Sequence, residues 1–183
     1  MRAEQTYGEV LKQDLGALIT SVELPELNRH FLRARWLDQI VWAEGRADAA
    51  RRRHYGLRLV AIVGGVIVPA LVSLNLQPAV AAVIGWVTFA ISLAVAVCLA
   101  LESFFHWGER WMHYRRLAEL LKSEGWLFFQ LGGPYQEAGT HAKAYPEFAK
   151  RVEAMLASDV DAFIAQVARE KATSAQEERA PKP

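Results

Sequence analysis

The sequence has one cysteine among its 183 residues, which excludes a disulfide framework and a zinc site built from several cysteines. It also lacks an excess of charge of either sign, because 21 lysines and arginines stand against 20 aspartates and glutamates. General nucleic-acid binding needs a strong basic excess, so we expect no nucleic-acid partner. What remains informative is how the charges are distributed along the chain.

The largest absence is local, because the 43 residues Leu59–Leu101 contain no Asp, Glu, Lys or Arg. A membrane-spanning helix needs roughly 20 apolar residues, so this stretch is too long for one span and suits two. The segment Asn75–Pro78 is polar for this stretch and predicts a turn, with the proline in the first turn of the next helix. The sequence therefore predicts transmembrane helices over about residues 57–75 and 78–101.

A soluble bundle with two wholly buried helices is the alternative to this hairpin. A soluble helix in a chain of this size normally carries a polar stripe. The segment Val60–Val68 has none. We therefore favour an all-α membrane protein with a lipid bilayer as its first partner.

Basic residues flank both ends of the uncharged stretch, whereas its predicted turn has none. They are Arg46, Arg51, Arg52, Arg53 and Arg58 before it, and Arg110, Arg115, Arg116 and Lys122 after it. Positive charge is retained on the cytoplasmic side of membrane proteins. We expect a multi-pass protein of the inner (cytoplasmic) membrane with both termini in the cytoplasm.

Small residues recur four apart in both predicted spans, at Ala61 and Gly65 and at Ala81 and Gly85. Such rows allow close approach of helix backbones in lipid. Pro69 lacks a backbone donor and crowds the carbonyl of Gly65, which predicts a kink. The pair Gly65 and Pro69 is a candidate hinge, although such kinks are also purely structural in many spanning helices.

Four residues share one face of the second predicted span: Gly85, Thr88, Ser92 and Ala96. They are candidates for lining a pore. The alternative is that this face simply packs on the first span, with the two hydroxyls bonded to carbonyls of their own helix.

Charged helices are expected outside the spans. Helices over about residues 25–56 and 102–131 would extend the hairpin as a cytoplasmic antiparallel stalk. An apolar stripe in the second faces its partner at Trp107, Trp111, Tyr114, Ala118 and Leu121. We also predict a short helix within residues 1–24, a C-terminal amphipathic helix over about 146–171 and a disordered tail over 172–183.

Catalytic signals are missing from the sequence. No glycine-rich loop precedes a lysine and a helix, so no phosphate cradle is expected. His106 and Glu109 are three residues apart, but a di-metal bundle needs a second such pair and further carboxylates. Neither predicted span carries a charge, so the ion relay typical of coupled transporters is absent. We expect no enzyme activity, no metal and no cofactor.

An ordered set of motifs in the charged helices resembles a known family. Its residues are Trp36, Asp38 and Glu44, then Glu109, Arg110, Trp111, Tyr114, Arg115, Glu119, Lys122, Glu124 and Trp126. Together with Pro69 and a later Arg151-Val152-Glu153, they are similar to the SLATT superfamily. These are two-transmembrane effector domains associated with SMODS nucleotidyltransferases and SLOG sensor domains. The resemblance covers roughly residues 25–156, treated as one SLATT-like domain over 25–171.

The resemblance implies a pore-forming or channel-forming effector of a bacterial nucleotide-signalled defence system. A separate cytoplasmic sensor or nucleotidyltransferase would supply the trigger. Two spans of one chain cannot enclose a water path, so conduction requires a homo-oligomer. A non-conducting membrane anchor or scaffold that recruits cytoplasmic partners is the alternative function.

Overall fold

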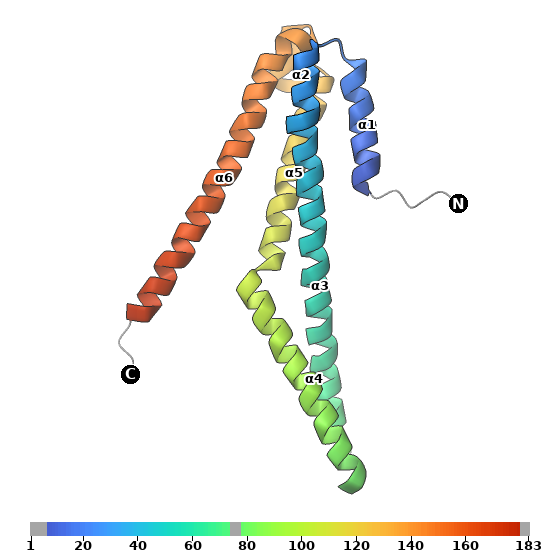
Figure 1. Cartoon of the computed structure of the whole chain (residues 1–183), viewed down its shortest axis with the longest axis vertical. Helices are drawn as coiled ribbons and strands as arrows, with labels where there is room; N and C mark the ends of the chain where they lie inside the picture. The colour runs from blue at the N-terminus through green and yellow to red at the C-terminus, as the bar shows by residue number, and fades with distance from the viewer. Residues whose placement is uncertain (1–6, 74–77, 180–183) are drawn as a thin grey trace, which may run out of the picture. The chain divides into compact units, whose positions relative to one another are not determined.

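The computed structural model describes residues 7–73 and 78–179, and within them the chain forms helices and no β-strand (Figure 1). The elements are α1 (Tyr7–Ser21), α2 (Glu26–Phe31), the π-helical stretch η1 (Leu32–Leu37), α3 (Asp38–Val72), α4 (Pro78–Phe105), α5 (Trp107–Phe129), the 3-10 helix η2 (Gly133–Ala138) and α6 (His141–Arg179). The prediction of an all-α chain is confirmed.

Two of these helices have the composition of membrane spans. They lie in the run Glu26–Val72 and in the segment Ala82–Phe105, each of which is long and apolar enough to cross a bilayer. Only 6% of the apolar window of the first is buried, and none of that of the second. The core helix of a soluble protein would be mostly buried, so the soluble-bundle alternative is disfavoured. The predicted turn at residues 75–77 lies outside the described residues.

The helix boundaries differ from the prediction at three places. A single helix was expected to run on from the second span, but the chain breaks at His106, whose φ of 50° is left-handed. The C-terminal helix expected from about residue 146 begins earlier, at His141, and η2 precedes it. This last helix continues to Arg179, so the expectation of a disordered tail is wrong for residues 172–179.

The chain divides into two compact units. One consists of residues 1–43 and 116–183, and the other of residues 44–115. We call the first the charged unit and the second the hairpin unit, and describe each by itself.

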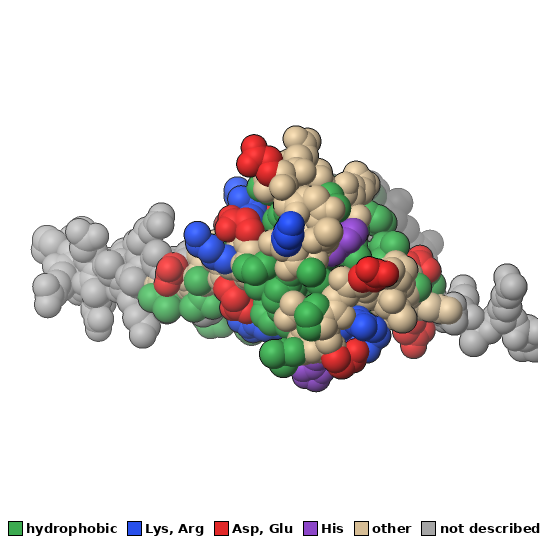
Figure 2. Space-filling view, turned by 90° about the horizontal axis from the view of Figure 1, so that it is seen from above, with side chains coloured by type: hydrophobic (Ala, Val, Ile, Leu, Met, Phe, Trp, Pro, Cys, Tyr) green, Lys and Arg blue, Asp and Glu red, His purple; other side chains and the backbone are tan. Residues whose placement is uncertain are grey.

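The charged unit has a hydrophobic core built by α1, η1, the start of α3, α5, η2 and α6. Its fully buried large side chains are Trp36, Tyr135, Phe128, Phe148, Ile19, Leu32, Ile40, Leu121 and Val152. Trp36 makes edge contacts with Phe129 and Phe148, and Phe128 packs on Phe148 with ring centroids 4.4 Å apart. At the end of the molecule seen in Figure 2, acidic, basic and apolar side chains are intermixed, and no single sign of charge dominates.

The hairpin unit is organised by a seam between α3 and α4, which lie side by side (Figure 1). The seam consists of the buried or half-buried residues of α4 and of the part of α3 from residue 57 to residue 72. They are Leu57, Ala61, Gly64, Val68 and Leu71 on α3, and Ile84, Thr88, Ile91, Val95, Cys98 and Glu102 on α4. Both rows advance by alternating steps of four and three residues, the repeat of helices that wrap around each other with a small left-handed crossing angle.

Candidate functional site

The glycine on the seam is Gly64 rather than the predicted Gly65. A Cβ at position 64 would collide with a methyl group of Val95 and lie 3.3 Å from Ile91, so only glycine permits this approach of the two helices. Gly65 is exposed, and a Cβ there would meet nothing within 4 Å. Pro69 is also exposed, and α3 continues through it as one helix to Val72. The candidate hinge residues therefore lie off the seam.

The four candidate pore residues do not share one environment. Thr88 is half-buried on the seam, whereas Gly85, Ser92 and Ala96 are exposed and turned away from α3. The alternative that the whole face packs on the first span is therefore wrong for these three residues. Within the hairpin unit they form a row of small side chains along α4 that the chain itself does not cover.

A histidine and a carboxylate close the charged end of the seam, which we define as residues 51–58 with residues 102–110. His54 Nδ1 lies 2.5 Å from Glu102 Oε1. Both side chains are shielded, with 15% and 26% of their surfaces exposed. The second carboxylate oxygen of Glu102 is buried and accepts no hydrogen bond from the described residues. The backbone of Gly108 packs on this pair, because a Cβ there would lie 3.0 Å from the His54 ring.

Two further contacts connect α3 with α5 inside the hairpin unit. The carboxylate of Glu44 is buried and accepts a 3.0 Å hydrogen bond from Arg115 Nη1. The rings of Tyr55 and Trp111 meet edge to face at 6.0 Å. Three motif residues, Glu44, Trp111 and Arg115, are thus accounted for by packing and ion pairing rather than by a chemical centre.

The charged unit contains a buried polar network around Glu124 on α5. Arg151 on α6 donates to both carboxylate oxygens of Glu124, at 2.5 and 3.1 Å, and the hydroxyl of Tyr135 donates to Oε1. Burial opposes ionisation of Glu124, but the hydrogen bonds from Arg151 and Tyr135 outweigh it and lower the pKa of this carboxyl. Burial and the hydrogen bond to Glu124 raise the pKa of Tyr135, so the phenol stays protonated.

A second arginine-carboxylate pair joins η1 to α6. Arg35 donates from Nε and Nη2 to the two oxygens of Glu153, at 2.8 and 2.9 Å. The hydrogen bond from Arg35 lowers the pKa of Glu153, although both side chains remain nearly half exposed. This forked geometry is the strongest that an arginine and a carboxylate adopt.

The remaining motif residues lie on the surface or at short-range contacts. Asp38 pairs with Lys12 at 3.2 Å, and Glu119 pairs with Lys122 at 2.8 Å. Tyr114 is half-buried with its ring 5.6 Å from that of His113. The side chains of Glu109, Arg110 and Trp126 are exposed. The motif set therefore marks the folding of the charged helices and does not converge on one point.

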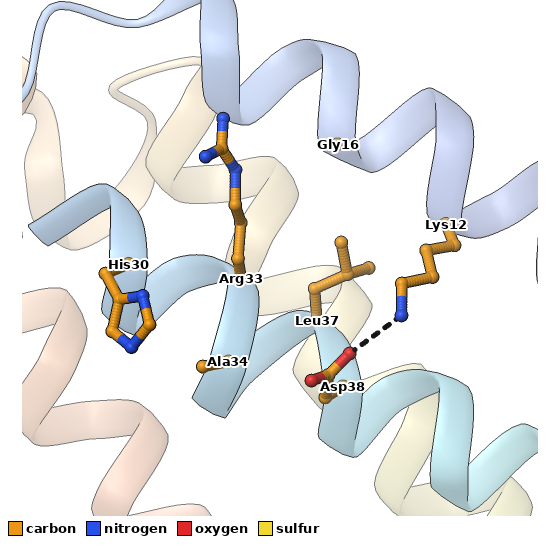
Figure 3. A pocket seen from close by; sticks show the side chains of 7 residues that line it. All are labelled: Lys12, Gly16, His30, Arg33, Ala34, Leu37 and Asp38. Carbon is orange, nitrogen blue, oxygen red and sulfur yellow. Dashed lines mark hydrogen bonds and ion pairs between the residues drawn. The ribbon is translucent and has the colours of Figure 1, made fainter. Parts of the chain in front are cut away.

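A hollow of about 280 Å³ opens between α1 and the helical run α2–η1 (Figure 3). Its walls are Lys12, Gly16, His30, Arg33, Ala34, Leu37 and Asp38. The polar side chains drawn in Figure 3 do not converge, because Lys12 is bonded to Asp38 and the Arg33 side chain points toward α1. Arg33 donates to Thr20 of that helix at 3.1 Å. These bonds dock α1 on the core.

No group of three or more His, Cys, Asp or Glu side chains able to hold a metal occurs in the part of the chain that the structure describes. Sequence reasoning missed three features: the His54–Glu102 pair, the role of Tyr135 and the seam position of Gly64. Glu102 is the first charged residue after the uncharged stretch, which was the only available signal for the pair. The partners lie 48 residues apart.

Comparison with known proteins gives one match. Residues 38–143, more than half of the chain, match the family described as DUF4231, a protein of unknown function. Neither a curated protein nor a solved structure matches the chain. The matched segment contains α3, α4, α5 and η2, and so includes the entire hairpin seam. The chain belongs to the DUF4231 family.

Proposed function

We propose that the chain forms an oligomeric two-transmembrane pore in the inner (cytoplasmic) membrane, with both termini in the cytoplasm. Support for the membrane location comes from the two long apolar helices, whose surfaces are almost entirely uncovered. The basic residues on both sides of the uncharged stretch support the orientation. Several subunits are required, since one pair of helices encloses no water path.

One observation carries the oligomer in this proposal. The seam uses one face of α4 for contact with α3, and the small residues Gly85, Ser92 and Ala96 lie outside it. Small side chains in a span allow another helix to approach closely, and a serine hydroxyl facing pure hydrocarbon gains nothing there. In an oligomer, this row of small residues would contact a helix of a neighbouring copy of the chain or line a water path shared with it.

Mass photometry of the protein in lipid nanodiscs tests the assembly. We expect a discrete oligomer at all measurable protein concentrations, and a monomer would overturn the proposal. Proteoliposomes loaded with a small dye or potassium then test conduction directly.

A matched pair of substitutions connects any flux to the exposed row. Ser92→Leu should abolish flux, because the added side chain fills the row. Ala90→Leu adds comparable bulk at an exposed position on another flank of α4 and should leave flux unchanged. Equal loss in both variants, or no loss in either, would contradict the assignment of this row.

A non-conducting anchor or scaffold is the second candidate, and the lack of any charge over Leu59–Leu101 favours it. It predicts no flux from any variant and unchanged binding of cytoplasmic partners in Ser92→Leu. From the resemblance to the SLATT superfamily we further propose a role as effector in bacterial defence. A nucleotidyltransferase or sensor encoded beside the gene would support that role.

A further inference from the structure

We propose that one flank of α3, at the charged end of the seam, binds an anionic phospholipid of the membrane. This site rests on the membrane location proposed above, but not on the pore. Exposed side chains recur along the flank at steps of four, three and four residues, and we call them the α3 flank: Arg51, Tyr55, Arg58 and Ile62. Residues at these spacings lie above one another on a helix surface. The seam uses a different face of α3, through Leu57 and Ala61.

The composition of the α3 flank changes from cationic to aliphatic at Arg58. This arginine is the last charged residue before the uncharged stretch. Ile62 and then Val66 follow it at helical spacing, with 58% and 69% of their surfaces exposed. A phospholipid shows the same change, from a charged phosphate to acyl chains. An acyl chain along the two aliphatic residues therefore brings the phosphate to the level of Arg58.

Tyr55 lies at the level of the lipid headgroups. It is about 6 Å along the helix axis from Leu59, where the uncharged stretch begins, and this distance falls within the headgroup layer. Its ring meets Trp111 edge to face at 6.0 Å, so α5 fixes its position, yet 54% of its surface is exposed. Tyrosine is enriched at membrane interfaces because its ring is apolar and its hydroxyl is polar. The hydroxyl supplies a donor for a phosphate oxygen between two arginines.

The arginines of the α3 flank are available to a ligand. Arg58 and the neighbouring Arg52 are exposed and make no ion pair with the described residues. Arg51 pairs with Asp48 at 3.2 Å, but both side chains are more than a third exposed, so this contact is weak. Asp48 is the only carboxylate of α3 in this region, and three arginines outweigh it. A guanidinium matches the geometry of a phosphate and binds it through two parallel hydrogen bonds.

The opposite flank of α3 provides an internal comparison. Arg53 lies there, about 160° around the helix from Tyr55. It is also exposed and without an ion pair to the described residues. The residues one turn away from it carry no aromatic ring and no second cation: Ala49, Ala50, Gly56 and Leu57. Arg53 therefore has the same charge as Arg58 without the surroundings of a lipid site.

Native mass spectrometry of the full chain in a nonionic detergent tests the site. Such a micelle has no surface charge, so the general attraction of basic residues to an anionic membrane is absent. Phosphatidylglycerol and phosphatidylcholine with the same acyl chains are added in steps, and the fraction of chains that retain a lipid gives an apparent Kd for each. We expect phosphatidylglycerol to bind at least about fivefold more tightly, the factor that one basic residue contributes at an anionic surface. Equal affinities would overturn the proposal.

A matched pair of substitutions assigns the preference to the α3 flank. Arg58→Gln should weaken binding of phosphatidylglycerol about fivefold and leave phosphatidylcholine unchanged. Arg53→Gln removes the same charge from the opposite flank and should leave both affinities unchanged. Both side chains are exposed, so circular dichroism should show intact helices in both variants. An equal loss in the two variants, or no loss in Arg58→Gln, would overturn the assignment.

Glycerol phosphate distinguishes a lipid from a free phosphate. It carries the phosphate without acyl chains, so at the concentration of the lipid it should not displace phosphatidylglycerol from the chain. Displacement would show that the site takes a free phosphate, and the lipid would be overturned as its ligand.

Flotation of the reconstituted chain with liposomes separates failure of this site from failure of the proposed function. If the chain floats with no liposome, the membrane location falls and the lipid site falls with it. If the chain inserts but binds the two lipids equally, only the lipid site falls. A monomer that retains phosphatidylglycerol overturns the pore and supports the site.

Discussion

Trp36 Nε1 donates a 2.9 Å hydrogen bond to the backbone carbonyl of Leu121, which joins η1 to α5 inside the core of the charged unit. The indole is fully buried, so its donor needs this acceptor. Gly125 lies one turn further along α5, where a Cβ would collide with the indole ring. The position of the tryptophan therefore depends on a glycine in a different helix.

Gly125→Ala should destabilise the charged unit, although alanine is the better helix former. The added methyl group overfills a closely packed site, which costs about 1–3 kcal/mol. Thermal unfolding followed by circular dichroism in detergent measures the loss. Gly45→Ala is the matched control, because a Cβ there meets nothing within 4 Å and should be neutral or slightly stabilising. Equal unfolding temperatures of the two variants would contradict the close contact between Gly125 and the Trp36 ring.

Glu124→Gln should also destabilise this unit. The substitution removes the charge that accepts from Arg151 and Tyr135 and leaves buried donors poorly matched, at a cost of about 1–3 kcal/mol. Glu119→Gln removes an exposed carboxylate paired with Lys122 and should change stability by about 0.5 kcal/mol or less. Chemical denaturation of both variants decides, and a similar small change in both would show that the network contributes little.

The pH dependence of unfolding should identify the same network. The pKa values of Glu124 and Glu153 are lowered from 4.5 in the folded chain. Their stabilisation is therefore fully present above about pH 4.5 and is lost as the pH falls through the folded values. We expect a steep fall in unfolding temperature in this acid range for the wild type and a shallower one for Glu124→Gln. Parallel curves would contradict the assignment to this carboxylate.

Arg35 and Glu153 allow a thermodynamic cycle between η1 and α6. Arg35→Glu and Glu153→Arg alone should each destabilise, because each places like charges in contact. The double exchange should recover most of the loss. Both side chains are nearly half exposed, so the coupling energy should be about 0.2–1 kcal/mol. If the effects of the two single substitutions on stability simply add up, the pair orients η1 and α6 but contributes no coupling energy.

Much of the secondary structure followed from the sequence because length and composition decide it. An uncharged stretch of 43 residues has the length of two membrane-spanning helices. The charged segments on both sides have few residues that interrupt a helix, so long helices are expected there as well. The break at His106 escaped prediction, since histidine carries no helix-stopping signal and its left-handed backbone depends on neighbouring contacts. The continuation of α6 to Arg179 was also not predicted. The small and charged residues after Lys171 have a composition typical of a disordered tail, although they form helix in the structure.

The seam was less predictable because two adjacent glycines differ by one helical position. Gly64 and Gly65 are equally small, and a four-residue spacing from Ala61 selected the wrong one. The heptad-like steps of four and three, which place Gly64 on the seam, become visible only when the buried residues of both helices are compared. The partnership of His54 with Glu102 depends in addition on the register of α4 against α3.

The two glycines give a direct test of the seam. Gly64→Ala should destabilise the hairpin by about 1–3 kcal/mol, because its methyl group meets Val95. Gly65→Ala has open space around the new methyl group and should leave stability unchanged or slightly raised. Adding Val95→Ala to Gly64→Ala removes the colliding side chain and should restore part of the loss. Unfolding in mixed micelles with increasing sodium dodecyl sulfate measures all three variants. Equal stability of Gly64→Ala and Gly65→Ala would contradict the seam described between α3 and α4.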